Sequence, residues 1–445
     1  MASSDPASAT DTILLHPRPL SRTAGSFALL PLLPFRREMI PLPAEVWTKI
    51  LGYVFEYYNN LSDSERRRPD PLRNELRQGL LVLSKDLIDI VLPLFYAHTI
   101  LDSVSALEKF TRYVHLCDQK WDSIRRIPYS TPGRWVQHLD LRGVDVCLPS
   151  ELLHADTLLM TLFPLLPFLG RCDLNPSLAL SRRPTLALGG RCEIAHLRVL
   201  KGLRSKCSVH STDDHLAELV RVCVNLEELA IVGTGIDVTD FDTPGEWDTL
   251  GSSKPLELPH LRKLVMLSMP YSPVMRTLLH AHLPALRHLT ITPYDVGYVP
   301  ASLVTQFIHE HGQLLASLHF FTMKTWPAIL MPSPDDILQT CPNLSHLSLE
   351  TPMPMLCLRK TDPDHPLHVL SIPRPGPEFL AVLEALLPKM PALKIVRARD
   401  VRWLRPGMSL RAQQAGTQGE MVEWRRRLVR RGIQVVDSEW NTGPE

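Results

Sequence analysis

The apolar residues of this chain recur in a six-residue phrase of the form L-x-x-L-x-L, with apolar side chains at positions one, four and six. The clearest copies start at Leu226 and Leu344, and a looser copy starts at Leu197. The ten copies start at Val136, Leu169, Leu197, Leu226, Leu261, Leu286, Leu315, Leu344, Leu367 and Leu393. Successive copies start 23 to 35 residues apart. A recurrence with this spacing is typical of a stacked repeat protein.

Each phrase predicts one β-strand, because alternate residues of a strand point to opposite sides of the sheet. Positions one, four and six turn inward, and positions three and five turn outward. A single strand cannot bury its apolar row alone, so neighbouring copies are expected to stack as a parallel sheet over one shared core. The segments between phrases bring the chain back, and several have a helical apolar pattern: 215–223, 275–282, 303–311 and 379–389.

The approach to the strand is repeated as well as the strand itself. Cys223-Val224-Asn225-Leu226 and Cys341-Pro342-Asn343-Leu344 place the same residue types before two of the phrases. Over roughly 135–401 the chain resembles the leucine-rich repeat family. The resemblance implies an α/β solenoid, with parallel strands on one side and helices on the convex side.

A different pattern occupies the region before the repeats. Pro43 suits the first turn of a helix, and Glu45 lies near the positive end of that helix. From Leu42, apolar residues follow at intervals of four, with two more widening the apolar face; they are Leu42, Val46, Ile50 and Val54, with Trp47 and Leu51. This spacing predicts an amphipathic helix. A second apolar helix is predicted over 76–88, and a charged stretch separates the two.

These two helices resemble the F-box, a small helical module that opens roughly as L-P-x-E-[IVL]-[WL]-x-x-I-[LF]. The matching residues are Leu42, Pro43, Glu45, Val46, Trp47, Ile50 and Leu51, with Leu83 in the later L-x-x-L-S-K portion. An F-box followed by leucine-rich repeats is a known architecture, and the run from Leu80 to the end resembles F-box-like proteins of fungal type. The resemblance implies that these residues dock onto the linker subunit of a cullin–RING ubiquitin ligase. The stretch 56–74 is longer than a compact module requires.

The alternative interpretation is that the N-terminal helix pair only covers the open end of the solenoid core, which needs a cap. The two interpretations differ in the surroundings of Trp47, Ile50 and Leu51. Exposure of these three side chains favours docking, and burial of all three against the first repeat favours the cap.

The pattern divides the chain into five segments. Residues 1–38 are rich in Ser, Ala, Thr and Pro and are expected to form a disordered tail; 39–96 form the F-box-like helical module. Residues 97–131 are expected to be a helical connector, with an apolar stripe of Val104, Leu107, Phe110 and Val114. The solenoid spans 132–437 and ends in a capping helix, stopped by Gly432, and a last strand; 438–445 form a tail.

Composition narrows the functional classes. A hydrophobic content of 44% with 21% charged residues is that of a globular protein. The net charge of +1 makes nucleic acid an unlikely partner. The eight cysteines contain no C-x-x-C pair, which argues against a zinc cluster and a disulfide framework and favours a cytoplasmic or nuclear compartment. No apolar run has the length of a membrane span, so no membrane partner is expected.

The sequence contains none of the common catalytic or nucleotide-binding motifs. We therefore expect a protein that is not an enzyme and has no cofactor, metal ion or small-molecule substrate. His280 with His282 and His309 with His311 are two residues apart on expected helices and would point to different sides. Surface histidines are the better interpretation.

Positions three and five of successive phrases line one inner surface, which is polar and rich in histidine. The candidate target-binding residues on it are His138, Glu228, Lys263, His288, His319, His346 and Arg397. The sequence thus predicts a substrate-recognition adaptor of a ubiquitin ligase, which docks through 39–96 and holds an unknown target protein with the repeats. The alternative is a leucine-rich-repeat scaffold without a ligase.

Overall fold

The computed structural model describes residues 42–59, 79–81, 87–119, 132–191, 194–205, 215–233, 256–268, 273–292, 303–323, 333–359, 361–403 and 417–443. The expected tail over 1–38, Leu83 and most of the expected helix over 76–88 lie outside these residues.

One parallel sheet of twelve strands runs through the described residues, and the order of its strands follows the chain. The strands are β1 His98–Ile100, β2 His138–Leu141, β3 Arg171–Leu174, β4 Val199–Ser205, β5 Glu228–Gly233, β6 Lys263–Leu267, β7 His288–Ile291, β8 Ser317–Phe320, β9 His346–Ser348, β10 Val369–Ile372, β11 Ile395–Ala398 and β12 Gln434–Val436. All ten phrases contain a strand, which confirms the α/β sheet predicted from their spacing.

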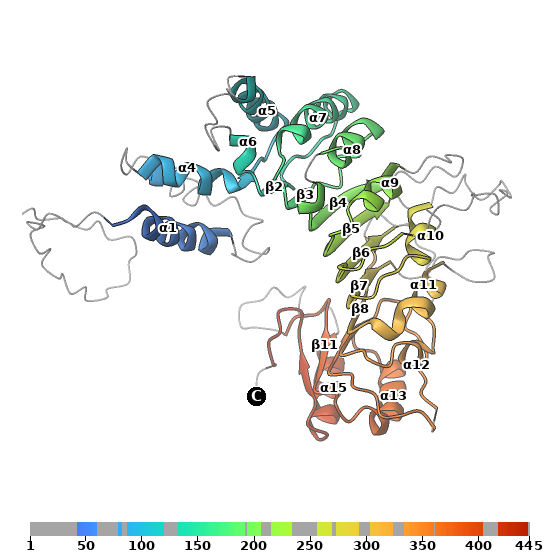
Figure 1. Ribbon diagram of the computed structural model, residues 1–445. Helices are drawn as coiled ribbons and strands as arrows, with labels where there is room; N and C mark the ends of the chain where they lie inside the picture. The colour runs from blue at the N-terminus through green and yellow to red at the C-terminus, as the bar shows by residue number, and fades with distance from the viewer. Residues whose placement is uncertain are drawn as a thin grey trace, which may run out of the picture.

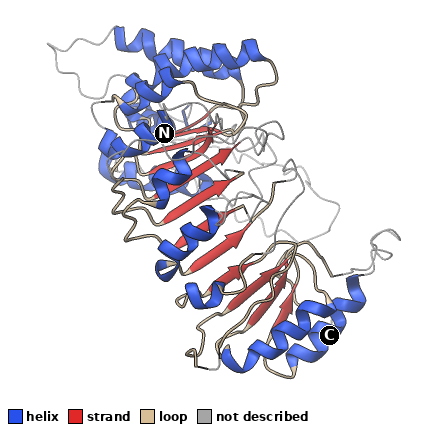
Figure 2. Ribbon diagram, turned by 90° about the vertical axis from the view of Figure 1, so that its right-hand side faces the viewer, coloured by secondary structure: helices blue, strands red, loops and turns tan. Residues whose placement is uncertain are grey.

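The helices are α1 Ala44–Asn59, α4 Ile88–Ala97, α5 Val104–Gln119, α6 Pro132–Trp135, α7 Pro149–Leu162, α8 Arg182–Gly189, α9 His215–Val222, α10 Pro273–Leu279, α11 Leu303–His311, α12 Ile337–Thr340, α13 Pro377–Leu386 and α15 Thr417–Val429. The helices from α7 to α13 lie on the outer side of an arc whose inner side is the sheet, whereas α1 and α4 extend from the N-terminal end of the arc (Figure 1). Short 3-10 helices follow several of them. Figure 2 shows the strands stacked as a ladder beside the helices.

The inward positions of the phrase form the core. In the phrase that contains β5, Leu226 and Ile231 are fully buried and Leu229 is 1% exposed. The same positions are buried in each of the other phrases, and the core extends without a break from Leu101 to Val435. A parallel sheet buried in this way gains its stability from neighbouring repeats and not from any one strand.

The residues that precede the strand make the same kind of hydrogen bond in both repeats. The side-chain amide of Asn225 donates to the carbonyl oxygen of Ala195 at 2.9 Å, and that of Asn343 donates to Gln313 at 2.8 Å. Each bond ties one repeat to the repeat before it. Cys223 and Cys341 are fully buried beside these asparagines, and burial raises the pKa of each thiol to about 12. Both cysteines are therefore packed thiols, as their repeated position predicts.

Three local expectations are wrong. The connector expected to be helical from residue 97 begins instead with β1, which pairs with β2. The helix predicted over 76–88 is expected to end at Ile88, where α4 begins instead, and α4 continues through Pro93 to Ala97. His311 is buried rather than on the surface, and its Nε2 lies 3.1 Å from the carbonyl oxygen of Leu279. Its imidazole thereby supplies a partner to a carbonyl at the end of α10.

The looser phrase at Leu197 has a physical cause. Leu200 pairs with Leu229, but the next pair is Leu203 with Ile231, so β4 contains one extra residue. Gly202 occupies the sixth position of the phrase with φ +77°, and Leu203 takes the buried place instead. A Cβ at Gly202 would overlap the carbonyl oxygen of Leu174 on the neighbouring strand. Glycine is required here both by the backbone conformation and by the close approach.

We expect the Gly202→Ala substitution to lower the free energy of unfolding by roughly 2–4 kcal/mol, because it combines a positive φ with a backbone overlap. Urea denaturation followed by circular dichroism measures this change. Gly419→Ala is the matched control, because a Cβ at Gly419 meets open space in α15. Alanine there is expected to leave stability unchanged or to raise it by up to about 1 kcal/mol. Equal stability of the two variants would contradict this account of the bulge.

Candidate functional site

An apolar stripe lies exposed on α1. Leu42 is 44% exposed, Val46 38%, Ile50 42% and Tyr53 72%. Their spacing of four, four and three residues places them on one side of the helix. Pro43 starts this helix, and its carbonyl oxygen accepts hydrogen bonds from the amides of Val46 and Trp47.

The opposite side of α1 packs against α4. Leu51 and Phe55 are 4% and 3% exposed, and with the fully buried Val91 of α4 they form a small core. This core is distinct from the long core of the repeats. The N-terminal end of the repeat core is formed by residues that do not belong to α1. They include Leu101, which follows β1, and Leu107 of α5.

The docking residues predicted from the sequence thus divide into two groups. Leu42, Pro43, Glu45, Val46 and Ile50 are exposed on α1. Trp47 is half-buried and Leu51 is buried in the small core, while Leu83 lies outside the described residues. The three side chains that distinguish docking from a cap therefore do not share one environment, and none of them belongs to the core of the repeats.

A second candidate surface is a hollow on the inner side of the sheet, across β5 to β8, with a volume of about 540 Å³. Four of the residues predicted to bind a target line it: Glu228, Lys263, His288 and His319. They come from four successive strands. Glu228, Lys263 and His288 stand side by side at position three of their phrases, and His319 stands at position five of the next phrase, opposite Thr290.

In the lining of the hollow, the positive side chains are more available to a ligand than the negative ones. Its carboxylates are paired with cations on β4 or just before it: Glu228 lies 2.7 Å from Lys201, and Glu227 lies 3.2 Å from Arg198. Lys263 projects into the hollow from β6. It is joined by Arg262 and Arg287, which precede β6 and β7.

The two arginines and Glu227 were missed by the sequence analysis, which considered only positions three and five of the phrase. They stand at position two, just before the strand begins. A signal existed in the sequence, since position two is charged in four successive phrases, at Arg198, Glu227, Arg262 and Arg287.

A chain of polar contacts continues from the hollow toward the C-terminal strands. His319 Nε2 lies 3.2 Å from His346 Nδ1, and His346 Nε2 lies 2.9 Å from the hydroxyl of Ser371. Burial is the main cause that lowers the pKa of His319, and the basic neighbours His346, His288, Arg399 and Lys263 contribute, so that the pKa falls to about 4. Burial lowers the pKa of His346 as well. Both imidazoles are therefore neutral at pH 7.

The two remaining predicted target-binding residues lie at the ends of the sheet. His138 of β2 is bonded to Asp173 of β3 at 2.9 Å. Arg397 of β11 lies 4.5 Å from the ring centre of Trp440 and donates to the carbonyl oxygen of Ser438 at 2.6 Å. The segment after β12, expected to be a tail, thus packs against the last strands, where the buried Asp437 accepts from the amides of Glu439 and Asn441.

Comparisons with known proteins give no family. No protein-family model and no curated protein sequence matches the chain. Among solved structures, a crystal structure of a Bacteroides fragilis protein is 12% identical with a TM-score of 0.32, and the match covers 74% of this chain and 73% of that chain. A chain in the crystal structure of the Rad7 and Elc1 complex in yeast is 14% identical with a TM-score of 0.28, covering 82% of this chain and 94% of that one. At these TM-scores neither likeness carries information on function.

Of the helices that the structure describes, none combines the length and apolarity needed to cross a membrane.

The lowered pKa of His319 predicts a pH dependence of stability. The unfolded chain takes up a proton near pH 6.5, and the folded chain does so only near pH 4. The contribution of neutral His319 to the free energy of unfolding is therefore complete above pH 6.5. It is lost as the pH falls toward 4, at up to about 1.4 kcal/mol per pH unit for one proton.

We expect His319→Asn to reduce this slope, and His260→Asn, which changes an exposed histidine that is not among the neighbours of His319 named above, to leave it unchanged. Urea denaturation of both variants and the wild type at several pH values between 4 and 7 measures the slopes. Parallel pH profiles for the wild type and His319→Asn would show that His319 does not contribute.

Proposed function

We propose that this protein is a recognition adaptor of a cullin–RING ubiquitin ligase. In this proposal the exposed side of α1 docks onto the linker subunit of the ligase, and the inner surface of the repeats holds a target protein. The chain itself makes and breaks no bonds. It raises the concentration of the target near an enzyme carried by another subunit.

The observation that carries the proposal is the exposed stripe on α1, in which three of the four residues belong to the F-box-like signature. Leu42, Val46 and Ile50 match the signature and are each more than a third exposed. Contiguous apolar side chains on one helix side, left in water, are typical of a surface that packs against another protein. A helix laid into a groove of the partner is the form of contact that this stripe suits.

The packing of α1 favours docking over a cap. A cap would place its apolar residues in the core of the first repeat, as α5 does with Leu107 and Val114. The buried residues of α1, Leu51 and Phe55, pack instead with Val91 in the separate small core. The helix is thus anchored from behind by α4 and keeps its other side available for a partner.

The inner surface suits the second half of the proposal. The hollow across β5 to β8 presents Lys263, Arg262 and Arg287 together with hydrogen-bonding histidines. A concave surface of this kind, spread over several repeats, is what solenoids use to bind other proteins. The partner that complements the three cations is a protein segment with carboxylate or phosphate groups.

We expect the double substitution Val46→Ala with Ile50→Ala to weaken binding of the purified linker subunit by tenfold or more, on the order of the loss of two interface anchors. Isothermal titration calorimetry on the full-length protein measures the affinity. Both side chains are exposed, so the fold is expected to persist, which circular dichroism checks.

The matched control is Leu153→Ala with Leu186→Ala, which removes two exposed leucines from α7 and α8 on the outer side of the arc. Linker binding by this control should equal that of the wild type. A wild type that does not bind the linker subunit would overturn the ligase proposal and leave the repeat scaffold without a ligase. Binding that both double variants retain would place the docking contact elsewhere on the chain.

A further inference from the structure

The first three strands bring two imidazoles and two carboxylates together on the inner side of the sheet. In the parallel pairing of β1 with β2, His98 stands opposite His138. Two residues further along β2, Asp140 stands opposite Asp173 of β3. Residues two apart on a strand share one face, so all four side chains are directed to the same side.

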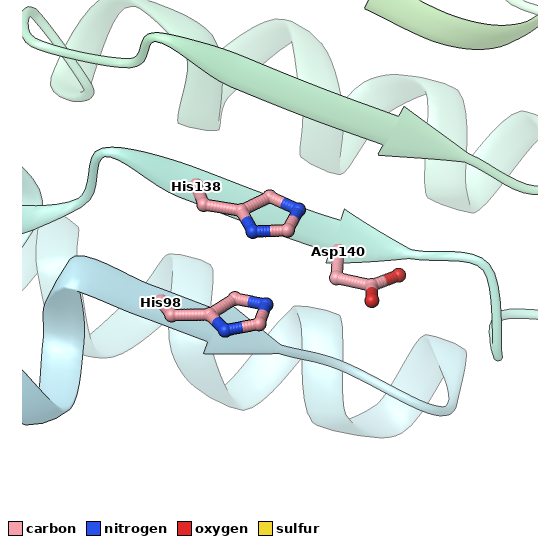
Figure 3. Close-up of side chains that lie close together, drawn as sticks. All are labelled: His98, His138 and Asp140. Atoms are coloured by element: carbon pink, nitrogen blue, oxygen red, sulfur yellow. The ribbon is translucent and has the colours of Figure 1, made fainter. Parts of the chain in front are cut away.

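The geometry of this cluster is close. The rings of His98 and His138 are stacked with their centres 4.0 Å apart and their planes 8° from parallel. Figure 3 shows the carboxylate of Asp140 beside the two rings. Each of the three residues offers one possible metal-ligand atom, and these atoms lie within 4.8 Å of one another. His98 and Asp140 are 4% and 5% exposed, so the cluster is largely removed from water.

Two arginines hold the carboxylates in place. Arg142 bonds to both oxygens of Asp140, with its Nε 3.0 Å from Oδ1 and its Nη2 2.7 Å from Oδ2. Asp173, which is fully buried, accepts from Arg171 Nε and lies 2.9 Å from His138 Nε2. The charge of the buried Asp140 carboxylate is thus compensated by Arg142, whose side chain is 37% exposed and borders on solvent.

We propose that His98, His138 and Asp140 form a binding site for a divalent transition-metal ion of the zinc class, and that the ion competes with Arg142 for the carboxylate of Asp140. Two imidazoles and one carboxylate are a ligand set that zinc takes in proteins, with the fourth position left to water or another ligand. Borderline-soft nitrogen ligands favour zinc, cobalt or nickel over magnesium and calcium. Asp173 acts as a positioning residue, since it fixes His138 through a hydrogen bond.

Binding requires a small contraction that the sheet can supply. Ligand atoms around a tetrahedral zinc ion are about 3.3 Å apart, given bonds of about 2.0 Å. The atoms therefore have to approach one another, and the stacked rings have to tilt so that each nitrogen points to the ion. Among the strands that the structure describes, β1 lies at the edge of the sheet beside β2, so His98 can move more readily than a residue in the middle of the sheet. Arg142 can turn toward solvent.

The ion would join β1 to β2. Because α4 ends at Ala97 and β1 starts at His98, metal binding would strengthen the junction between the helical N-terminal part and the repeats. A ligand that binds only the folded chain also raises its melting temperature.

The test uses the full-length protein after removal of metals by a chelator. Zinc is titrated in competition with a chromophoric chelator, and cobalt is titrated with its visible absorption as a readout of coordination. We expect one tight equivalent in the wild type and an affinity at least about a hundredfold lower in His98→Phe and in Asp140→Asn, since each loses one ligand. Arg142→Ala should bind zinc about tenfold more tightly, because the competing cation is gone.

Phenylalanine at position 98 keeps a stacked ring in place of the imidazole, and the melting temperature without metal reports whether each variant is folded. His288→Phe, an exposed histidine on β7, is the matched control and should bind zinc like the wild type. Zinc should raise the melting temperature of the wild type and of His288→Phe but not that of His98→Phe. Absence of tight zinc binding in the wild type, or equal binding by the wild type, His98→Phe and Asp140→Asn, would overturn the proposal.

Discussion

The structure depends on one constraint, which is that no strand of this chain can bury its apolar row without a neighbour. Each phrase offers three inward side chains, such as Leu226, Leu229 and Ile231, and the core they form is shared with the strands on either side. The same stacking decides where function can reside. With the inward positions committed to the core, the outward positions of all strands are gathered on one inner face, and the returning helices are kept on the outer side.

Strand spacing turns this inner face into a set of close polar contacts. Neighbouring strands lie about 4.8 Å apart, so side chains at equal phrase positions touch unless one of them is small. Longer side chains also reach diagonally across this spacing: His319 and Asp173 stand at position five and contact His346 and His138, which stand at position three of the neighbouring phrase. Where the face is most open, between β5 and β8, the cations remain accessible and a hollow forms. At both ends the contacts close over the face, with Asp140 buried at one end and Ser371 at the other.

The sequence predicts the strands well because the apolar positions of the phrase are the positions that neighbouring strands have to bury. The prediction fails where contacts between elements, and not the local sequence pattern, decide the structure. β1 is only His-Thr-Ile and carries no phrase, yet it joins the sheet because β2 offers an unpaired edge. Which side of α1 faces outward is also beyond the sequence, since Leu42 and Val46 are as apolar as Leu51 and Phe55. The choice is made by α4, whose Val91 packs with the latter pair.

The junction between the two cores has a consequence for an adaptor. α4 passes directly into β1 without an intervening loop, and Tyr96 in its last turn lies against Phe110 of α5 and Trp135 of α6, with ring centres 6.4 and 6.0 Å apart. The direction of α4, and of the α1 stripe that rests on it, is thus set by the register of the sheet. A flexible link would spread a bound target over many positions, whereas a fixed junction holds it at one distance from whatever α1 binds. In the proposed adaptor, the packing around Tyr96 would therefore fix the distance between the two proposed binding surfaces.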